Sequence, residues 1–204
     1  MERFWTEETG LMRRNLKALG FGGSVPCAFF VFGEMFRTML RLRPYKSCDA
    51  ETIVSWIKDE YAFRQWCADR YDHFPIIADD IIERYLEDSK GGRFLPFTAE
   101  DENGSVIGHF ILRYPSDDKA VLRLGFVILD KSARGKGFGC EMVGLAKKYA
   151  SEVLNARKLT LGVFENNTSA YKCYLSAGFV PSGEYDSFQV FGENWKSIEM
   201  EVTF

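Results

Sequence analysis

The residues of this chain that are best suited to chemistry follow an apolar run near position 121. The run VLRLGFVIL is typical of a buried strand, and Arg134-Gly135-Lys136-Gly137-Phe138-Gly139 comes after it, just before a helical pattern. A glycine-rich turn at a helix start leaves backbone N–H groups free at the positive end of the helix dipole. Such turns bind phosphate or pyrophosphate, so this order of elements predicts an anion site.

Two common phosphate-binding motifs fit this turn poorly. The P-loop needs a Lys after its last Gly and then Ser or Thr, but Lys136 is followed by Gly137. The dinucleotide fingerprint G-x-G-x-x-G, counted from Gly135, needs a Gly where the chain has Cys140. The pattern that does fit is Arg-x-x-Gly-x-Gly, which is filled by Arg134, Gly137 and Gly139. For this segment alone, a purely structural turn stays open.

A second motif follows at the distance that one helix, one loop and one strand would occupy. Residues 159–164 read as a strand, and a polar turn, a helix and a Gly-Phe pair come after it. The pattern Asn-x-x-Ala-x-x-x-Tyr…Gly-Phe is filled by Asn167, Ala170, Tyr174 and Gly178-Phe179. In this order, the two motifs resemble those of the GCN5-related N-acetyltransferases, the GNAT family. The resemblance covers about residues 39–204.

The resemblance implies acetyl-CoA as cosubstrate and places it on the first motif. In this family the pantetheine arm pairs like an added β-strand with the strand before the glycine turn, here at Phe126, Val127 and Ile128. The remaining cofactor contacts that it implies are Arg134, Gly135, Lys136, Gly137, Phe138, Gly139 and Asn167. Gly125 agrees with this, because Gly inside a strand often marks a bulge or a close backbone approach.

The resemblance also implies direct transfer of acetyl to a primary amine, on a small molecule or a protein, in a ternary complex. The acetyl oxygen gains charge and needs a donor, which we expect near Val127 N–H. Tyr174 matches the family's acid for the leaving thiolate, although Tyr171 and Tyr174 are three residues apart and could both be packing residues. The alternative from another class is a coenzyme A-binding regulatory or interaction module that has lost turnover.

The general base stays unassigned. An alkylammonium must lose a proton before it attacks, and many relatives use a Glu on one of the two splayed strands. Neither expected strand carries one, and Gly162 stands where some ribosomal-protein acetylases have Glu. Glu165, Asp130 and Glu60 are weak candidates that fit solvated surface charges better. A water relayed by backbone carbonyls is a further option.

Three other polar residues have two readings each. Arg123 lies within an apolar strand and could either hold a carboxylate in the acceptor pocket or form a salt bridge on the solvated face, and we weigh these readings equally. His109 fits a hydrogen-bonded core histidine better than a catalytic one. Cys173 is next to Tyr174, but adjacent helix positions point apart, so we assign it to packing.

The elements that position these residues can be read from periodicity and turn signals. Strands are expected at 39–43, 94–99, 106–114, 120–129, 159–164, 185–191 and 195–202. Helices are expected from the N-cap Asp49 to about Glu60, around Phe63, over 77–86, from the glycine turn to about Asn155, and around Tyr174. The expected fold class is α/β (α+β), a mixed, mostly antiparallel sheet with a splayed parallel strand pair and helices on both faces.

Composition limits the partners. The chain has 204 residues and a net charge of −3, which argues against nucleic acid or an anionic membrane as the main partner. Five cysteines without metal-type spacing, with only two histidines, favour reduced thiols in the cytoplasm and no metal site. We expect a monomer or homodimer. Residues 1–38 read as an N-terminal extension, as a disordered arm or as sequence before the natural start, and 39–204 as the acetyltransferase domain.

Overall fold

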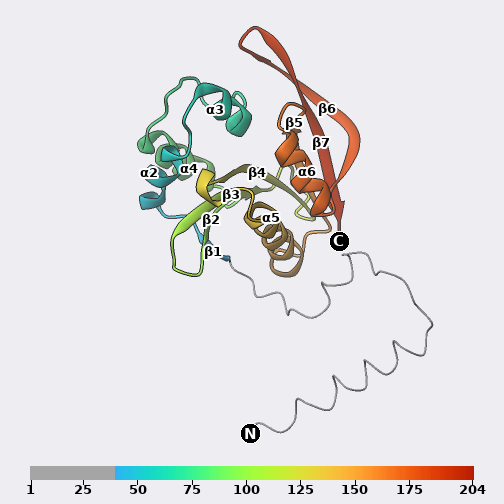
Figure 1. The fold of residues 1–204 in the computed structure, drawn as a ribbon. Helices are drawn as coiled ribbons and strands as arrows, with labels where there is room; N and C mark the ends of the chain where they lie inside the picture. Colours follow the sequence, from blue (N-terminus) through green and yellow to red (C-terminus); the bar gives the residue numbers. More distant parts are fainter. Residues whose placement is uncertain (1–39) are drawn as a thin grey trace, which may run out of the picture. The chain divides into compact units, whose positions relative to one another are not determined.

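The computed structural model describes residues 40–204, which form a seven-stranded sheet with helices on both faces (Figure 1). The expected extension at 1–38 lies outside the described residues. The strands are β1 (Arg41–Pro44), β2 (Phe94–Glu100), β3 (Val106–Arg113), β4 (Val121–Leu129), β5 (Lys158–Phe164), β6 (Val180–Val190) and β7 (Glu193–Thr203). Each of the expected strands is present, with ends that differ by a few residues.

The parallel pair β4 and β5 is the feature of the sheet that matters most for the site. The strand order is β1-β2-β3-β4-β5-β7-β6, and the other neighbours are antiparallel. β4 and β5 pair only over Val121–Arg123 and Lys158–Thr160. Beyond Arg123 the two strands splay, so β4 has a free edge on this side. The predicted fold class is confirmed.

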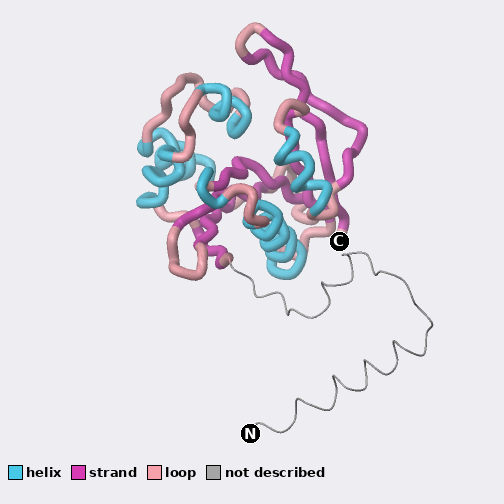
Figure 2. Tube along the Cα trace, in the orientation of Figure 1, coloured by secondary structure: helices cyan, strands magenta, loops and turns pink. Residues whose placement is uncertain are grey.

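Helices cover the two faces of the sheet, as the cyan and magenta segments of Figure 2 show. One face carries α2 (Ala50–Ser55), α3 (Glu60–Cys67) and α4 (Ala78–Ser89), and the other carries α5 (Phe138–Lys148) and α6 (Thr168–Ser176). A π-helical turn, Tyr149–Val153, extends α5. Among residues 40–204, no helix is both long and apolar enough to span a bilayer.

Strand alternation divides the core between these two faces. On β3, Phe110 and Leu112 face the cluster under α5 and α6, whereas Ile111 faces the cluster under α2, α3 and α4. All three side chains are at most 3% exposed. Because both faces of β3 are buried, residues 110–112 read as a continuous apolar run, and the strand contacts both helical layers.

The first expected helix differs from the prediction. A single helix from Asp49 to about Glu60 was expected, but α2 ends at Ser55 and α3 begins at Glu60. Asp59 starts α3, because its carboxylate accepts from the backbone N–H of Ala62 at 2.8 Å. Asp49 makes no such cap for α2, because its carboxylate is bound elsewhere.

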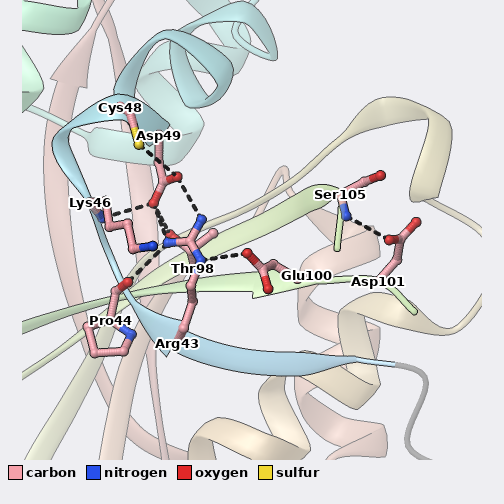
Figure 3. Close-up of polar contacts among 9 residues, drawn as sticks. All are labelled: Arg43, Pro44, Lys46, Cys48, Asp49, Thr98, Glu100, Asp101 and Ser105. Atoms are coloured by element: carbon pink, nitrogen blue, oxygen red, sulfur yellow. Dashed lines mark hydrogen bonds and ion pairs between the residues drawn. The ribbon is translucent and has the colours of Figure 1, made fainter. Parts of the chain in front are cut away.

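Asp49 holds β1, β2 and the first helical turn together (Figure 3). Its carboxylate accepts from Arg43 Nη1 at 2.7 Å and Nη2 at 2.8 Å, from the backbone N–H of Lys46 at 2.9 Å and from Thr98 Oγ1 at 2.8 Å. Arg43 Nε also binds Glu100 at 2.6 Å. Burial raises the pKa of Asp49, but the hydrogen bonds from Arg43, Lys46 and Thr98 outweigh it, so the net shift is downward.

Candidate active site

A bulge in β4 builds the centre of the site. Opposite the two-residue step from His109 to Ile111, β4 takes three residues from Ile128 to Gly125, so it carries one extra residue. Phe126 lies in the left-handed region with φ of 49°, which is costly for a non-glycine residue. As a result, Leu124 faces the α5 and α6 layer while Ile128 faces the α2, α3 and α4 layer.

One backbone carbonyl of the bulge is hydrogen-bonded by a side chain from the helical layer. Trp66 Nε1 on α3 donates to the carbonyl oxygen of Phe126 at 2.9 Å. The Trp66 and Phe126 rings lie 5.2 Å apart. Val127 packs toward the opposite layer. Because β5 has already left β4 at this level, the edge of residues 126–128 pairs with no strand on the β5 side within residues 40–204.

The glycine turn lies directly after this edge and opens to solvent. A short 3-10 turn at Lys131–Ala133 leads into it, and Asp130 accepts from the backbone N–H of Ser132 at 2.8 Å. Gly135 and Gly137 have φ of 74° and 87°, so a side chain would strain both. Gly137 is the N-cap of α5 and has no side-chain cap bond. The first N–H groups of α5 are therefore available to a ligand.

The second motif lies on α6, next to the start of α5. Asn167 caps α6, and its side chain accepts from the backbone N–H of Ala170 at 3.3 Å. Tyr174 is 7% exposed and lies edge-on to Phe179 with ring centroids 6.1 Å apart. Burial, and then the neighbouring Cys173, raise the pKa of Tyr174. Its phenol is therefore protonated at neutral pH and can act as a donor.

Two free thiols, one on α5 and one on α6, lie in contact where these helices meet. Cys140 Sγ in the first turn of α5 lies 2.9 Å from Cys173 Sγ, a proximity that the sequence analysis missed. Burial, and then Cys140, raise the pKa of Cys173 to about 12. Cys140 is exposed, so it is the accessible thiol of the pair.

This pair predicts a fast intramolecular cross-link. With a diazene oxidant such as diamide, both thiols lose hydrogen, one S–S bond forms and the reagent is reduced to the hydrazine. The intact mass is expected to fall by two hydrogens without dimer formation, and peptide mapping is expected to join Cys140 to Cys173. Cys140→Ser is expected to abolish this product. A product that instead joins Cys48 or Cys67 to Cys173 would contradict the geometry.

A cleft of about 370 Å³ opens where β4 and β5 splay, on the face of α3 and α4. Gly125 and Phe126 line it from β4, and Gly162 and Phe164 line it from β5. This face is opposite to the layer that holds the glycine turn's helix. The gap between β4 and β5 therefore has the cleft on one face of the sheet and the layer of the glycine turn's helix on the other.

Arg123 forms a salt bridge, as one of its two readings expected, but the pair is partly buried and lies at the cleft rather than on a solvated face. Its Nη1 and Nη2 donate to the two carboxylate oxygens of Glu199 on β7, at 2.5 and 2.6 Å. Gly162 pairs with Glu199 in the β5–β7 ladder. A Cβ at Gly162 would lie 2.8 Å from both Arg123 Nη2 and Glu199 Oε1. The ion pair therefore occupies the space that a side chain at position 162 would take.

Glu199 is the carboxylate that sequence reasoning missed. It belongs to the closing hairpin, and only its pairing with Gly162 reveals that it lies at the splay. Both of its oxygens are bound to Arg123, so the geometry favours an orienting role over proton removal. The three earlier candidates are placed differently: Glu60 pairs with Arg64 at 3.4 Å, Asp130 caps a turn and Glu165 is exposed.

His109 lies in the core, as its sequence context predicted. It is 0% exposed, and its Nε2 lies 2.8 Å from Tyr85 Oη. Burial lowers the pKa of His109 to about 3, so the ring is neutral at physiological pH. It lies inside the protein rather than at the splay and has no direct part in the site.

Comparisons with known proteins agree with this architecture. The model of the acetyltransferase (GNAT) domain matches residues 39–180. A spermine/spermidine N(1)-acetyltransferase of Bacillus subtilis (strain 168) is 27% identical over 106 residues, which cover 50% of this chain and 70% of that protein. The crystal structure of spermidine N-acetyltransferase from Vibrio cholerae in complex with CoA and spermine superposes with a TM-score of 0.70 at 23% identity, covering 81% of this chain and 96% of the other.

The family match spans both motifs and the splayed strands, and the similarity to the solved structure extends to the fold as a whole. The resemblance drawn from the two motifs is thereby confirmed, together with acetyl-CoA as the cosubstrate. The chain therefore belongs to the GNAT acetyltransferase family, and it transfers an acetyl group from acetyl-CoA to a primary amine.

Proposed function

We propose that acetyl-CoA binds along the free edge of β4, with its pyrophosphate on the turn that starts α5. The observation that carries this proposal is the continuity of an unpaired strand edge with a solvent-open glycine turn. The pantetheine arm would pair with Phe126, Val127 and Ile128 as an additional strand. The residues that we assign to the remaining cofactor contacts are Arg134, Gly135, Lys136, Gly137, Phe138, Gly139 and Asn167.

The chemistry that we propose is direct attack of the amine on the thioester carbonyl. The free amine nitrogen forms a bond to the acetyl carbon and loses a proton to water, and the carbonyl oxygen gains charge that Val127 N–H would stabilise. The C–S bond then breaks, and Tyr174 would donate its phenolic proton to the departing thiolate. Burial raises the pKa of Tyr174, so the phenol holds its proton at neutral pH and is a weaker acid than an exposed tyrosine.

We propose a small-molecule amine as the acceptor, since the cleft at the splay is about 370 Å³ and would enclose a small ligand. The named relatives act on spermine and spermidine, which are also small primary amines. We further propose a cytoplasmic monomer or homodimer. We propose no nucleic-acid partner for it, and the net charge of −3 supports this last point.

The test joins product detection to cofactor binding. The protein is incubated with acetyl-CoA and a panel of amines, and acetylated products are detected by mass. Gly137→Val is expected to weaken acetyl-CoA binding by at least tenfold, because valine resists a φ of 87° and displaces the free N–H groups. Gly92→Val is the matched control, since Gly92 also has a positive φ, of 64°, far from the motif.

Two results would count against these assignments. Equal acetyl-CoA affinity in Gly137→Val and the wild-type protein would remove the pyrophosphate site from this turn. Binding of acetyl-CoA without any acetylated product across amino acids, polyamines, simple amines and peptides would argue that this chain does not turn over.

A further inference from the structure

The acceptor cleft is lined by arginines from five separate segments. They are Arg70, Arg84, Arg93, Arg113 and Arg123. Asp88 is the one acidic residue among the described residues that line this cleft. The segments lie between positions 70 and 123, so this concentration of positive charge is a product of the fold and not of one basic stretch.

Four of these arginines already have a carboxylate partner. Arg123 is held by Glu199 at 2.5 Å, and the other pairs are Arg93–Asp117 at 2.7 Å, Arg84–Asp88 at 3.4 Å and Arg70–Asp69 at 3.7 Å. Arg113 is the exception. Within residues 40–204 its guanidinium makes no ion pair and no side-chain hydrogen bond.

A bound anion would also stabilise the positive charge of Arg113. It is partly buried at the end of β3 and lies directly opposite Arg123 in the β3–β4 ladder. Burial, then the charges of Arg123 and Arg70, lower the pKa of Arg113. A partly buried cation beside two like charges gains from an oxyanion that can accept two parallel N–H bonds.

We propose that the acceptor is a small amino acid whose carboxylate binds Arg113 while its amine reaches the splay at Gly125. This inference rests on the proposed function of the site. Along β4, Gly125 is two residues from Arg123, which corresponds to about 7 Å. A guanidinium side chain together with a bound amino acid spans that distance. The carboxylate would satisfy Arg113 and fix which nitrogen is presented to the thioester.

A polyamine fits this cleft less well. Four of the five guanidinium groups are paired with carboxylates, but an ammonium group in the cleft would still be repelled by Arg113, whose charge no carboxylate partner within residues 40–204 offsets. Glu184 and Asp186 line a neighbouring cavity, which shares Arg70 and Arg113 with the cleft. Both are exposed strand residues of β6, where solvent screens their charge, and neither is paired with Arg113.

The experiment compares matched acceptors. The twenty protein amino acids, their carboxamides, spermidine and spermine are each offered with acetyl-CoA to the wild-type protein, and products are quantified by mass. The amide keeps the amine and the side chain but removes the anion. We expect one or more amino acids to be acetylated with kcat/KM at least tenfold above their amides and above both polyamines.

Variants then test the residue. Arg113→Met is expected to raise the KM for the amino acid by about 10- to 100-fold, with the affinity for acetyl-CoA unchanged. The KM of Arg113→Lys is expected to lie between those of the wild type and Arg113→Met, because lysine keeps the charge but loses the planar fork of hydrogen-bond donors. Arg157→Met, an exposed arginine outside the cleft, is expected to leave KM unchanged. Amides or polyamines used as well as the amino acids, or an unchanged KM in Arg113→Met, would overturn the proposal.

The protein could fail to transfer acetyl and still bind an amino acid at Arg113, and the two outcomes can be told apart. If no amine is acetylated, the proposed function is what fails. Binding of the same amino acids to the CoA-loaded protein is then measured by calorimetry in the wild type and in Arg113→Met. Amino acid binding that depends on Arg113 would support the carboxylate site, and its absence would overturn it.

Discussion

Replacement of Tyr174 by phenylalanine is expected to lower kcat by about 100-fold and to leave the affinity for acetyl-CoA unchanged. Loss of a positioned general acid costs between about 10²- and 10⁴-fold, and phenylalanine keeps the ring that lies edge-on to Phe179. The measurement is steady-state turnover with the best acceptor, together with calorimetric binding of acetyl-CoA to the free protein.

Tyr171 supplies the control for this prediction. It lies three residues before Tyr174 on the same helix and packs at the edge of the same core. Tyr171→Phe removes an equivalent hydroxyl and is expected to change kcat less than twofold. Equal effects of the two substitutions would show that the Tyr174 hydroxyl has no special role in the transfer. A loss of acetyl-CoA affinity in Tyr174→Phe would instead make Tyr174 a cofactor-binding residue.

The parts of the site that could be predicted from the sequence are local ones. The glycine turn and the Asn167–Tyr174 helix each carry their signal within a few residues, because backbone conformation and capping depend on near neighbours. Their order along the chain then points to one family. The strands could also be predicted, since apolar alternation and turn residues are local properties.

The parts that could not be predicted depend on register and packing. One extra residue in β4 decides that Phe126 and Ile128 face the layer of α2, α3 and α4, and no composition signal marks it. Glu199 reaches the splay only because β7 pairs with β5 in one register, opposite Gly162. Arg113 and Arg123 meet for the same reason on β3 and β4. The chemistry of the acceptor cleft is therefore a long-range property of the sheet.

Replacement of Asp49 by alanine is expected to lower the free energy of unfolding by about 3 kcal/mol. The carboxylate is 3% exposed and accepts from Arg43, Lys46 and Thr98. Its removal leaves the buried hydroxyl of Thr98 without its acceptor, and Arg43 keeps only Glu100 as an ionic partner. Breaking a buried pair from one side costs about 3–5 kcal/mol, and the remaining contact to Glu100 places this case at the lower end.

Urea unfolding and thermal melting both measure this effect. A loss of about 3 kcal/mol corresponds to a fall in Tm of about 6–12 °C for a domain of this size. Asp117→Ala is the matched control, because Asp117 also pairs with an arginine but its side chain is 99% exposed. We expect it to leave the midpoint unchanged. Equal midpoints for Asp49→Ala and Asp117→Ala would show that the Asp49 network contributes little.

The stability difference between the wild type and Asp49→Ala is expected to depend on pH, with a defined sign. Because the folded pKa of Asp49 is lowered, its contribution is complete above the unfolded pKa of about 3.9 and is lost as pH falls through the folded value. The stability difference between wild type and Asp49→Ala is therefore constant near neutrality and shrinks below about pH 4. His109, whose pKa is lowered to about 3 by burial and raised a little by the charge of Asp49, destabilises both proteins as pH falls below its unfolded value of about 6.5. The loss of the Asp49 charge changes this effect only near the folded pKa of His109, so His109 cancels in the difference near pH 6, and a gap that narrows already there would identify a group other than Asp49.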